Sequence, residues 1–152
     1  MFQGHSIVVL DSKSRIVLPT KFRSKMSPES NNKIVLTRGL NGCLMLYPLD
    51  EWERVKIGLM KYNVFDEEER SFMRQFMMYV HECDLDSHNR FLLPSQLIEF
   101  AHIKKDVLLL GMLQNIEIWN PELKLELDNR SPETFESVAQ KVAEKFLNKS
   151  NN

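Results

Sequence analysis

At 152 residues, with 43% hydrophobic and 27% charged residues, the chain has the length and composition of a soluble globular protein. No apolar run approaches the roughly 20 residues that a membrane helix requires. Residues 1–13 lack the basic start and the long apolar core of a signal peptide. We therefore expect a cytoplasmic protein with no membrane partner.

Charge is unevenly distributed along the chain. The net charge of −1 by itself argues against a nucleic-acid partner. Residues 12–25, however, contain five Lys or Arg and no acid, whereas residues 66–69 are four consecutive acids. Such segregation creates a local positive field even when the total charge is near zero, although a charge run is more often a solvated surface than a binding site.

A ten-residue segment occurs twice. Residues 10–19, LDSKSRIVLP, recur as residues 85–94, LDSHNRFLLP, at an offset of 75 with six identical positions. The similarity continues downstream to Pro48 in the first copy and to Pro121 in the second. The shared order of strand, turn, strand, proline, strand, loop and strand predicts two copies of one structural unit.

Each copy is predicted to form two β-hairpins around a short helix. In the first copy, residues 6–10 and 15–18 are strands on either side of a polar turn. Pro19 stops the strand pairing and allows a short helix over residues 20–26; two further strands then flank a glycine-containing loop. A unit of this size buries too little surface to be stable alone, so we expect the copies to close on each other as one pseudo-symmetric barrel.

Three amphipathic helices are expected outside these strands. The first starts with a capping box at Asp50–Glu53, the second has the acids of Asp66–Glu69 in its first turn, and the third starts at Ser131. We interpret the apolar stripes of the last two as mainly core, with the methionines leaving room for subunit contacts. The stripes comprise Phe72, Met73, Phe76, Met77 and Val80, and then Phe135, Val138, Val142 and Phe146.

The Asp-x-x-x-Arg turn is the best candidate for a functional site. Asp11 and Arg15 in the first copy correspond to Asp86 and Arg90 in the second. In the structural interpretation, the aspartate caps the turn and pairs with the arginine. In the functional interpretation, the arginine contacts guanine edges or phosphate, for which its planar guanidinium is well suited. The duplication favours the functional interpretation. In that interpretation the aspartate orients the guanidinium and does not contact DNA itself, because a carboxylate would be repelled by phosphate.

Other chemistry has weaker support. The segment His81–Asp84, with His88 nearby, contains metal-ligand residue types, but alternate strand residues point to opposite faces and no zinc spacing is completed. The cysteines Cys43 and Cys83 have no metal-type spacing and are interpreted as small buried hydrophobic residues. No phosphate-binding or nucleophile motif is present. We expect no enzyme activity, no cofactor and no metal site.

The sequence resembles the MraZ family of bacterial regulators over roughly residues 1–147. The resemblance rests on the opening MFQGH, the turn DSKSR at residues 11–15, YPLDEW at residues 47–52, and the second copy of the turn. It implies an α+β, β-rich fold in which tandem SpoVT/AbrB-like swapped-hairpin units form one barrel. The expected boundaries are 5–51 for the first unit, 52–80 for connecting helices, 81–124 for the second unit and 125–152 for a C-terminal helix and tail.

The resemblance also implies a function. Members of the family assemble as rings, commonly octameric, and bind short direct repeats of double-stranded DNA in the promoter of the division and cell-wall gene cluster, which usually begins with their own gene. The expected role is a nucleoid-associated regulator, typically a repressor. The DNA-contacting candidates are Lys13 and Arg15, with His88 and Arg90 as counterparts. The alternative left open is an oligomeric module that binds protein and has no direct DNA role.

This chain departs from the family at one position of each turn. The family usually has glycine before the motif arginine, whereas this chain has Ser14 and Asn89. Glycine takes a positive φ readily, asparagine tolerates it, and serine adopts it reluctantly. The second copy also has His88 in place of a lysine, so we expect it to be the weaker DNA contact.

Overall fold

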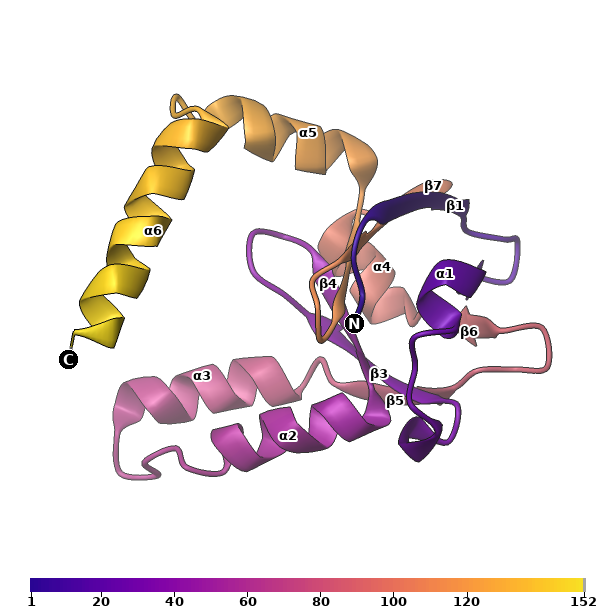
Figure 1. Ribbon diagram of the computed structural model, residues 1–152. Coiled ribbons are helices and arrows are strands. Elements are labelled where there is room, and N and C mark those ends of the chain that lie inside the picture. Colours follow the sequence, from indigo (N-terminus) through magenta and orange to yellow (C-terminus); the bar gives the residue numbers. More distant parts are fainter. Residues whose placement is uncertain (152) are drawn as a thin grey trace. The chain divides into compact units, whose positions relative to one another are not determined.

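The computed structural model describes residues 1–151 and is a mixed α+β structure (Figure 1). Its strands are β1 (His5–Val9), β2 (Arg15–Val17), β3 (Lys33–Arg38), β4 (Leu44–Pro48), β5 (His81–Asp84), β6 (Arg90–Leu92), β7 (Asp106–Gly111) and β8 (Ile116–Trp119). Its helices are α1 (Thr20–Arg23), η1 (Pro28–Ser30, a 3-10 turn), α2 (Leu49–Leu59), α3 (Glu67–Met77), α4 (Ser95–Ala101), α5 (Pro121–Arg130) and α6 (Phe135–Ser150). None of the helices in this range is long and apolar enough to cross a membrane. Residues 1–121 form one compact unit, and a second begins at Glu122.

The main sheet of the first unit interleaves strands from the two copies. Its order is β1-β7-β8-β4-β3-β5, with antiparallel neighbours throughout. In the internal repeat, β1 is equivalent to β5, β7 to β3, and β8 to β4. Equivalent strands therefore follow in the same order from either edge of the sheet. Each outer strand therefore pairs with the other copy, and neither copy completes a sheet of its own.

A separate two-stranded sheet joins the copies a second time. In it β2 pairs with β6 antiparallel, with Ile16 opposite Phe91. These two residues are equivalent at the repeat offset of 75, so an approximate two-fold axis passes between them. We call this pair of strands the ribbon.

Two topological predictions are wrong. The first-copy strand β2 does not fold back on β1 as a hairpin, because its ladder partner is β6. Two backbone bonds close the turn, from the Asp11 N–H to the Arg15 carbonyl and from the Ser14 N–H to the Asp11 carbonyl, both at 3.0 Å. A closed barrel is also absent from the described strands, since β1 and β5 are the outer strands of an open sheet. The second hairpin of each copy is confirmed, as β3–β4 and β7–β8.

Both sheets cover one hydrophobic core. Ile16 and Phe91 of the ribbon are buried in it, together with Phe22 of α1 and Leu97 of α4. The two short helices begin directly after Pro19 and Pro94, as the sequence predicts. Burial of the ribbon's inner face fixes its outer face toward solvent.

The helices α2 and α3 pack over a smaller second core. Trp52 of α2 lies buried there, with Phe76 and Val80 partly buried against it. The capping-box prediction for α2 is wrong, because Pro48 occupies the N-cap position and no side chain caps the helix. For α3 the prediction holds: Asp66 accepts a hydrogen bond from the Glu69 N–H at 3.0 Å, and three further acids fill the first turn.

The second unit consists of α5 and α6. Helix α5 was not expected from the sequence. Helix α6 begins at Phe135 rather than near Ser131, and the Thr134 hydroxyl caps it by accepting from the Ser137 N–H. The apolar stripe predicted as core (Phe135, Val138, Val142 and Phe146) is exposed.

Candidate nucleic-acid interface

The turn of the first copy is organised around the carboxylate of Asp11. One oxygen, Oδ1, accepts from the backbone N–H groups of Lys13 and Arg15, both at 2.8 Å. The other oxygen, Oδ2, accepts from the Arg15 Nε–H at 2.8 Å. A single carboxylate thus accepts from the turn backbone and from the guanidinium; that it orients the arginine for DNA stays a prediction.

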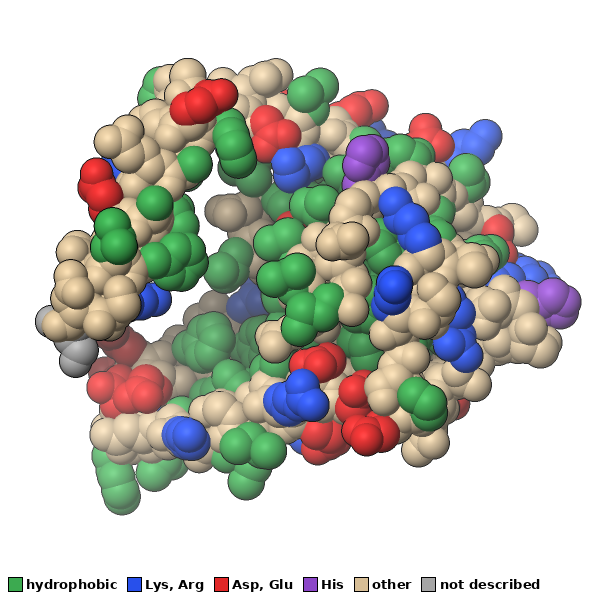
Figure 2. Space-filling model, in the orientation of Figure 1, with side chains coloured by type: hydrophobic (Ala, Val, Ile, Leu, Met, Phe, Trp, Pro, Cys, Tyr) green, Lys and Arg blue, Asp and Glu red, His purple; other side chains and the backbone are tan. Residues whose placement is uncertain are grey.

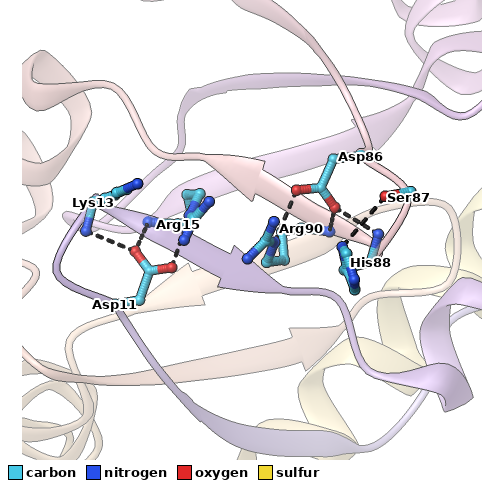
Figure 3. A network of polar contacts seen from close by, with 7 residues as sticks. All are labelled: Asp11, Lys13, Arg15, Asp86, Ser87, His88 and Arg90. Atoms are coloured by element: carbon cyan, nitrogen blue, oxygen red, sulfur yellow. Dashed lines mark hydrogen bonds and ion pairs between the residues drawn. The ribbon is translucent and has the colours of Figure 1, made fainter.

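The turn of the second copy repeats this geometry. Oδ1 of Asp86 accepts from the backbone N–H groups of His88 at 2.8 Å and Arg90 at 2.9 Å. Its Oδ2 accepts from the Arg90 Nε–H at 2.8 Å. The structure therefore brings each predicted aspartate and arginine together, in both copies (Figure 3).

These contacts stabilise the ionised carboxylates. The Arg90 backbone N–H is the largest cause that lowers the pKa of Asp86 to about 2; partial desolvation opposes it, and the guanidinium adds to it. The Arg15 backbone N–H lowers the pKa of Asp11 in the same way. Both carboxylates are therefore charged at neutral pH, and each stays bonded to its arginine.

The arginines use only part of their hydrogen-bonding capacity. Each guanidinium donates through Nε, and no partner within residues 1–151 reaches Nη1 or Nη2 of either side chain. Their side chains are 29% and 28% exposed, for Arg15 and Arg90 respectively. Figure 3 shows the two guanidinium groups near the middle of the ribbon, with Lys13 and His88 farther out at opposite ends. Nη1 and Nη2 of both arginines are therefore available to a ligand.

Two apolar side chains share the outer face with the arginines. In the register of the ribbon, Arg15 lies opposite Leu92 and Val17 lies opposite Arg90. Val17 and Leu92 are 51% and 56% exposed, while Ile16 and Phe91 between them face the core. Sequence reasoning missed these two residues, although period-2 alternation places each on the same face as its arginine.

The remaining cations differ in how far they are engaged. Lys21 donates to the His5 carbonyl, and Arg23 donates to the Asn32 side chain. The exposed ammonium of Lys13 has no partner among the described residues, and the His88 ring contacts only the Ser87 hydroxyl, at 3.3 Å. Of the basic segment, Lys13 is thus the cation placed beside the motif arginine and free to bind.

Both turns contain a residue in the left-handed region. Ser14 has φ 61° and Asn89 has φ 58°. Their carbonyls each accept a cross-copy bond at 2.8 Å, Ser14 from the Leu93 N–H and Asn89 from the Leu18 N–H. The turns therefore keep, without glycine, the backbone conformation that glycine favours. The two cross-copy hydrogen bonds connect each turn to the strand of the other copy.

The weaker metal candidate is dispersed on β5. Burial alternates along the strand, so His81 and Cys83 face inward while Glu82 and Asp84 face outward. Both acids pair with Lys33, and the His81 ring bonds the Gln96 side chain at 3.0 Å. Among residues 1–151 no three His, Cys, Asp or Glu side chains are grouped as a metal site.

Comparison of the sequence with known proteins assigns the chain to a family. The family described as "MraZ protein" matches residues 1–75 and again residues 76–151. The chain belongs to the MraZ family. It contains two tandem MraZ domains, as the internal repeat predicts, and the non-enzymatic character expected from the sequence agrees with this family.

Individual relatives align over almost the whole chain. The transcriptional regulator MraZ of Shewanella sp. (strain MR-7) is 37% identical over 138 residues, covering 90% of this chain and 91% of its own length. The protein of the same name from Shewanella baltica (strain OS195) is 36% identical with the same coverage. That of Thermoanaerobacter sp. (strain X514) is 35% identical over 140 residues, covering 92% and 95%.

Proposed function

We propose that this chain is a DNA-binding transcriptional regulator that places the outer face of its ribbon on duplex DNA. The observation that carries the proposal is the pair of arginines held through Nε, with no partner among residues 1–151 at either terminal nitrogen. Relatives across almost the full length are named transcriptional regulators, and a β-ribbon is narrow enough to enter the major groove.

Each group on the ribbon has a distinct task in this proposal. The terminal nitrogens of Arg15 and Arg90 make bidentate contacts to guanine or phosphate, each worth about 1–3 kcal/mol of discrimination at a base. Lys13 and the weaker His88 bind phosphate and fix the register of the ribbon. Asp11 and Asp86 stay bonded to their own turns, so that their charge is already compensated.

The exposed aliphatic side chains extend the same surface. Val17 and Leu92 lie opposite the arginines across the ribbon, and apolar contact with a thymine methyl group is a common way to recognise that base. Because the four side chains are related by the approximate two-fold axis, the ribbon offers two similar contact pairs. Short sites that alternate guanine with thymine fit this pattern.

We further propose that several copies of the chain act together on short direct repeats. Apolar side chains reach the surface along α2, the segment that joins it to α3 and the end of α3, including Ile57, Met60, Phe65 and Met78 (Figure 2). Monomers rarely expose so many neighbouring apolar groups, which favours assembly into a ring, with an octamer as the family resemblance suggests. Simultaneous contacts would raise the overall affinity by about 10²–10⁴.

The same resemblance suggests the target and the arrangement of the units. We propose repression at the promoter of the division and cell-wall gene cluster, including the chain's own gene, by a nucleoid-associated ring. The interleaved pairing of β1 with β7 and of β5 with β3 supports swapped-hairpin units of the SpoVT/AbrB type. Their proposed extents are 5–51 and 81–124, with linking helices at 52–80 and a C-terminal part at 125–152.

Fluorescence anisotropy with the chain's own upstream region tests the DNA role. We expect the double variant Arg15→Gln/Arg90→Gln to bind at least about ten-fold more weakly, with an unchanged oligomer mass. Arg74→Gln, an exposed arginine on α3, is the matched control. If the double variant binds DNA like the wild type, the ribbon is not the DNA-binding surface and the proposal is wrong. If the wild type itself does not bind DNA, the protein-binding module, with the exposed apolar surface of α2 and α3 as its contact, becomes the better account.

A further inference from the structure

A hollow in the first unit lies outside the DNA-binding candidate. It is formed by the loop between β3 and β4, one side of α3 and the end of α4, and its volume is about 540 Å³. The walls are mainly apolar, with Leu40, Met45, Phe72, Phe76 and Phe100 among the lining residues. Cavities of this size and character accommodate small organic molecules.

Arg38 is the cationic residue in the wall of this hollow. The guanidinium of Arg38, at the end of β3, lies over the ring of Tyr79 at 4.6 Å and over that of Phe100 at 5.7 Å. Its only hydrogen bond within residues 1–151 goes to the Gln75 side chain, at 3.3 Å, and no carboxylate in that range pairs with it. Aromatic rings offset part of its charge but supply no anion, so a half-buried guanidinium is left with free donors.

We propose that this hollow binds a small amphipathic carboxylate. The carboxylate accepts from the Arg38 guanidinium, which matches its planar geometry, and an unbranched apolar tail packs against Met45, Phe72 and Phe76. The hollow contains no residue of either Asp-x-x-x-Arg turn, so the proposal goes beyond the DNA role and does not rest on it.

Calorimetric titration of the full-length protein with octanoate, and with 1-octanol as the uncharged match, tests the proposal. We expect saturable binding of one octanoate per chain, and about ten-fold weaker binding of 1-octanol, since only the carboxylate forms a charge-assisted hydrogen bond. The methyl NMR signal of Met45, assigned with Met45→Leu, should shift on addition of octanoate. Absence of saturable binding, equal affinity for both ligands, or an unmoved Met45 signal overturns the proposal.

Two variants separate the charge from the shape of the hollow. Arg38→Gln should weaken octanoate binding about ten-fold and leave 1-octanol binding unchanged. Arg74→Gln, on α3 but outside the lining of the hollow, should change neither. Arg38 also packs on two rings, so Asn41→Asp provides a second variant: it adds a negative charge at the exposed rim with almost no change in size. Asn41 has φ 64°, which aspartate tolerates. Weaker octanoate binding by Asn41→Asp supports the proposal, and unchanged binding contradicts it.

A neighbouring subunit is the competing occupant. Phe72 is exposed at the rim, so Phe72→Glu would disrupt a subunit contact at this place. If this variant lowers the oligomer mass, and octanoate fails to bind the wild-type oligomer but binds wild-type protein that has dissociated on dilution, the hollow is a subunit interface and the proposal is wrong. If the wild-type oligomer binds octanoate through Met45, the hollow is open in the assembly, as the proposal requires.

Discussion

The Nε–H of Arg15 donates to Oδ2 of Asp11 at 2.8 Å, and the equivalent bond from Arg90 to Asp86 has the same length. This bond fixes the direction of the guanidinium without using its terminal nitrogens. A turn that served only the fold would gain little from leaving those donors in solvent. The geometry therefore fits a side chain held in advance for an external acceptor, since less side-chain entropy is lost on binding.

Asp11→Asn separates orientation from electrostatics. The amide oxygen of asparagine can still accept from the Lys13 and Arg15 backbone N–H groups, but its NH₂ cannot accept from Nε. Removal of a negative charge would by itself strengthen DNA binding. We expect the opposite, a loss of several-fold to about ten-fold, because one hydrogen bond to a charged group is lost. Anisotropy titrations measure it, with Glu29→Gln, an exposed acid on η1, as the control that should not weaken binding.

Acid titration tests whether the ionised Asp86 carboxylate stabilises the turn of the second copy. The folded pKa of Asp86 is about 2, below the ordinary aspartate value of 3.8. Its stabilising contribution is therefore present above about pH 4 and is lost as the pH falls toward 2. We expect Asp86→Asn to be less stable than the wild type at pH 5–7, with a difference that shrinks toward pH 2. Urea unfolding across this range measures it. A difference that stays constant down to pH 2 would show that the ionised carboxylate has no such role.

Ser14→Gly should stabilise the protein. Ser14 has φ 61°, a conformation that costs a residue with a Cβ about 1–2 kcal/mol, and glycine avoids this cost while losing some chain entropy. The expected gain in unfolding free energy is about 0.5–1 kcal/mol, with a smaller gain for Asn89→Gly. Ser12→Gly, in the same turn without a positive φ, should show no gain; an equal gain there would point to a different cause.

Gly111→Ala tests the interleaved edge of the sheet. A Cβ at this position would lie 2.5 Å from the Gln3 backbone nitrogen and 2.7 Å from its Cα, and backbone atoms cannot move aside cheaply. We expect a loss of about 1–3 kcal/mol in unfolding free energy. Gly58→Ala on α2 has no atom within 4 Å of its added Cβ and should be stabilising by about 0.5–1 kcal/mol. Thermal unfolding of the two variants compares them directly, and similar shifts would contradict the close approach.

The turns were predictable from the sequence because their contacts are local. Asp11 reaches only four residues ahead, and the repeat shows the arrangement twice. The partner of β2 was not predictable in this way, because residues 15–17 specify a strand but do not specify which strand it pairs with. Only the cross-copy register, with Ile16 opposite Phe91, reveals it.

The exposure of the apolar helix faces was also not predictable from the sequence. The stripe from Phe135 to Phe146 has the spacing of a buried face, and spacing alone does not tell whether the same chain or another molecule covers it. Val17 and Leu92 were missed for the reverse reason: they looked like ordinary strand residues. Their importance depends on the register of the ribbon, which only the structure provides.

A photo-crosslink from the ribbon to DNA tests directly whether the ribbon contacts the duplex. A benzoylphenylalanine placed at Val17, 51% exposed on the ribbon, is compared with one at Val64, which is also 51% exposed but lies between α2 and α3. We expect a crosslink to the chain's own upstream DNA from position 17 and none from position 64. DNA binding at full affinity with no crosslink from position 17, or with a crosslink from position 64 instead, would contradict this expectation.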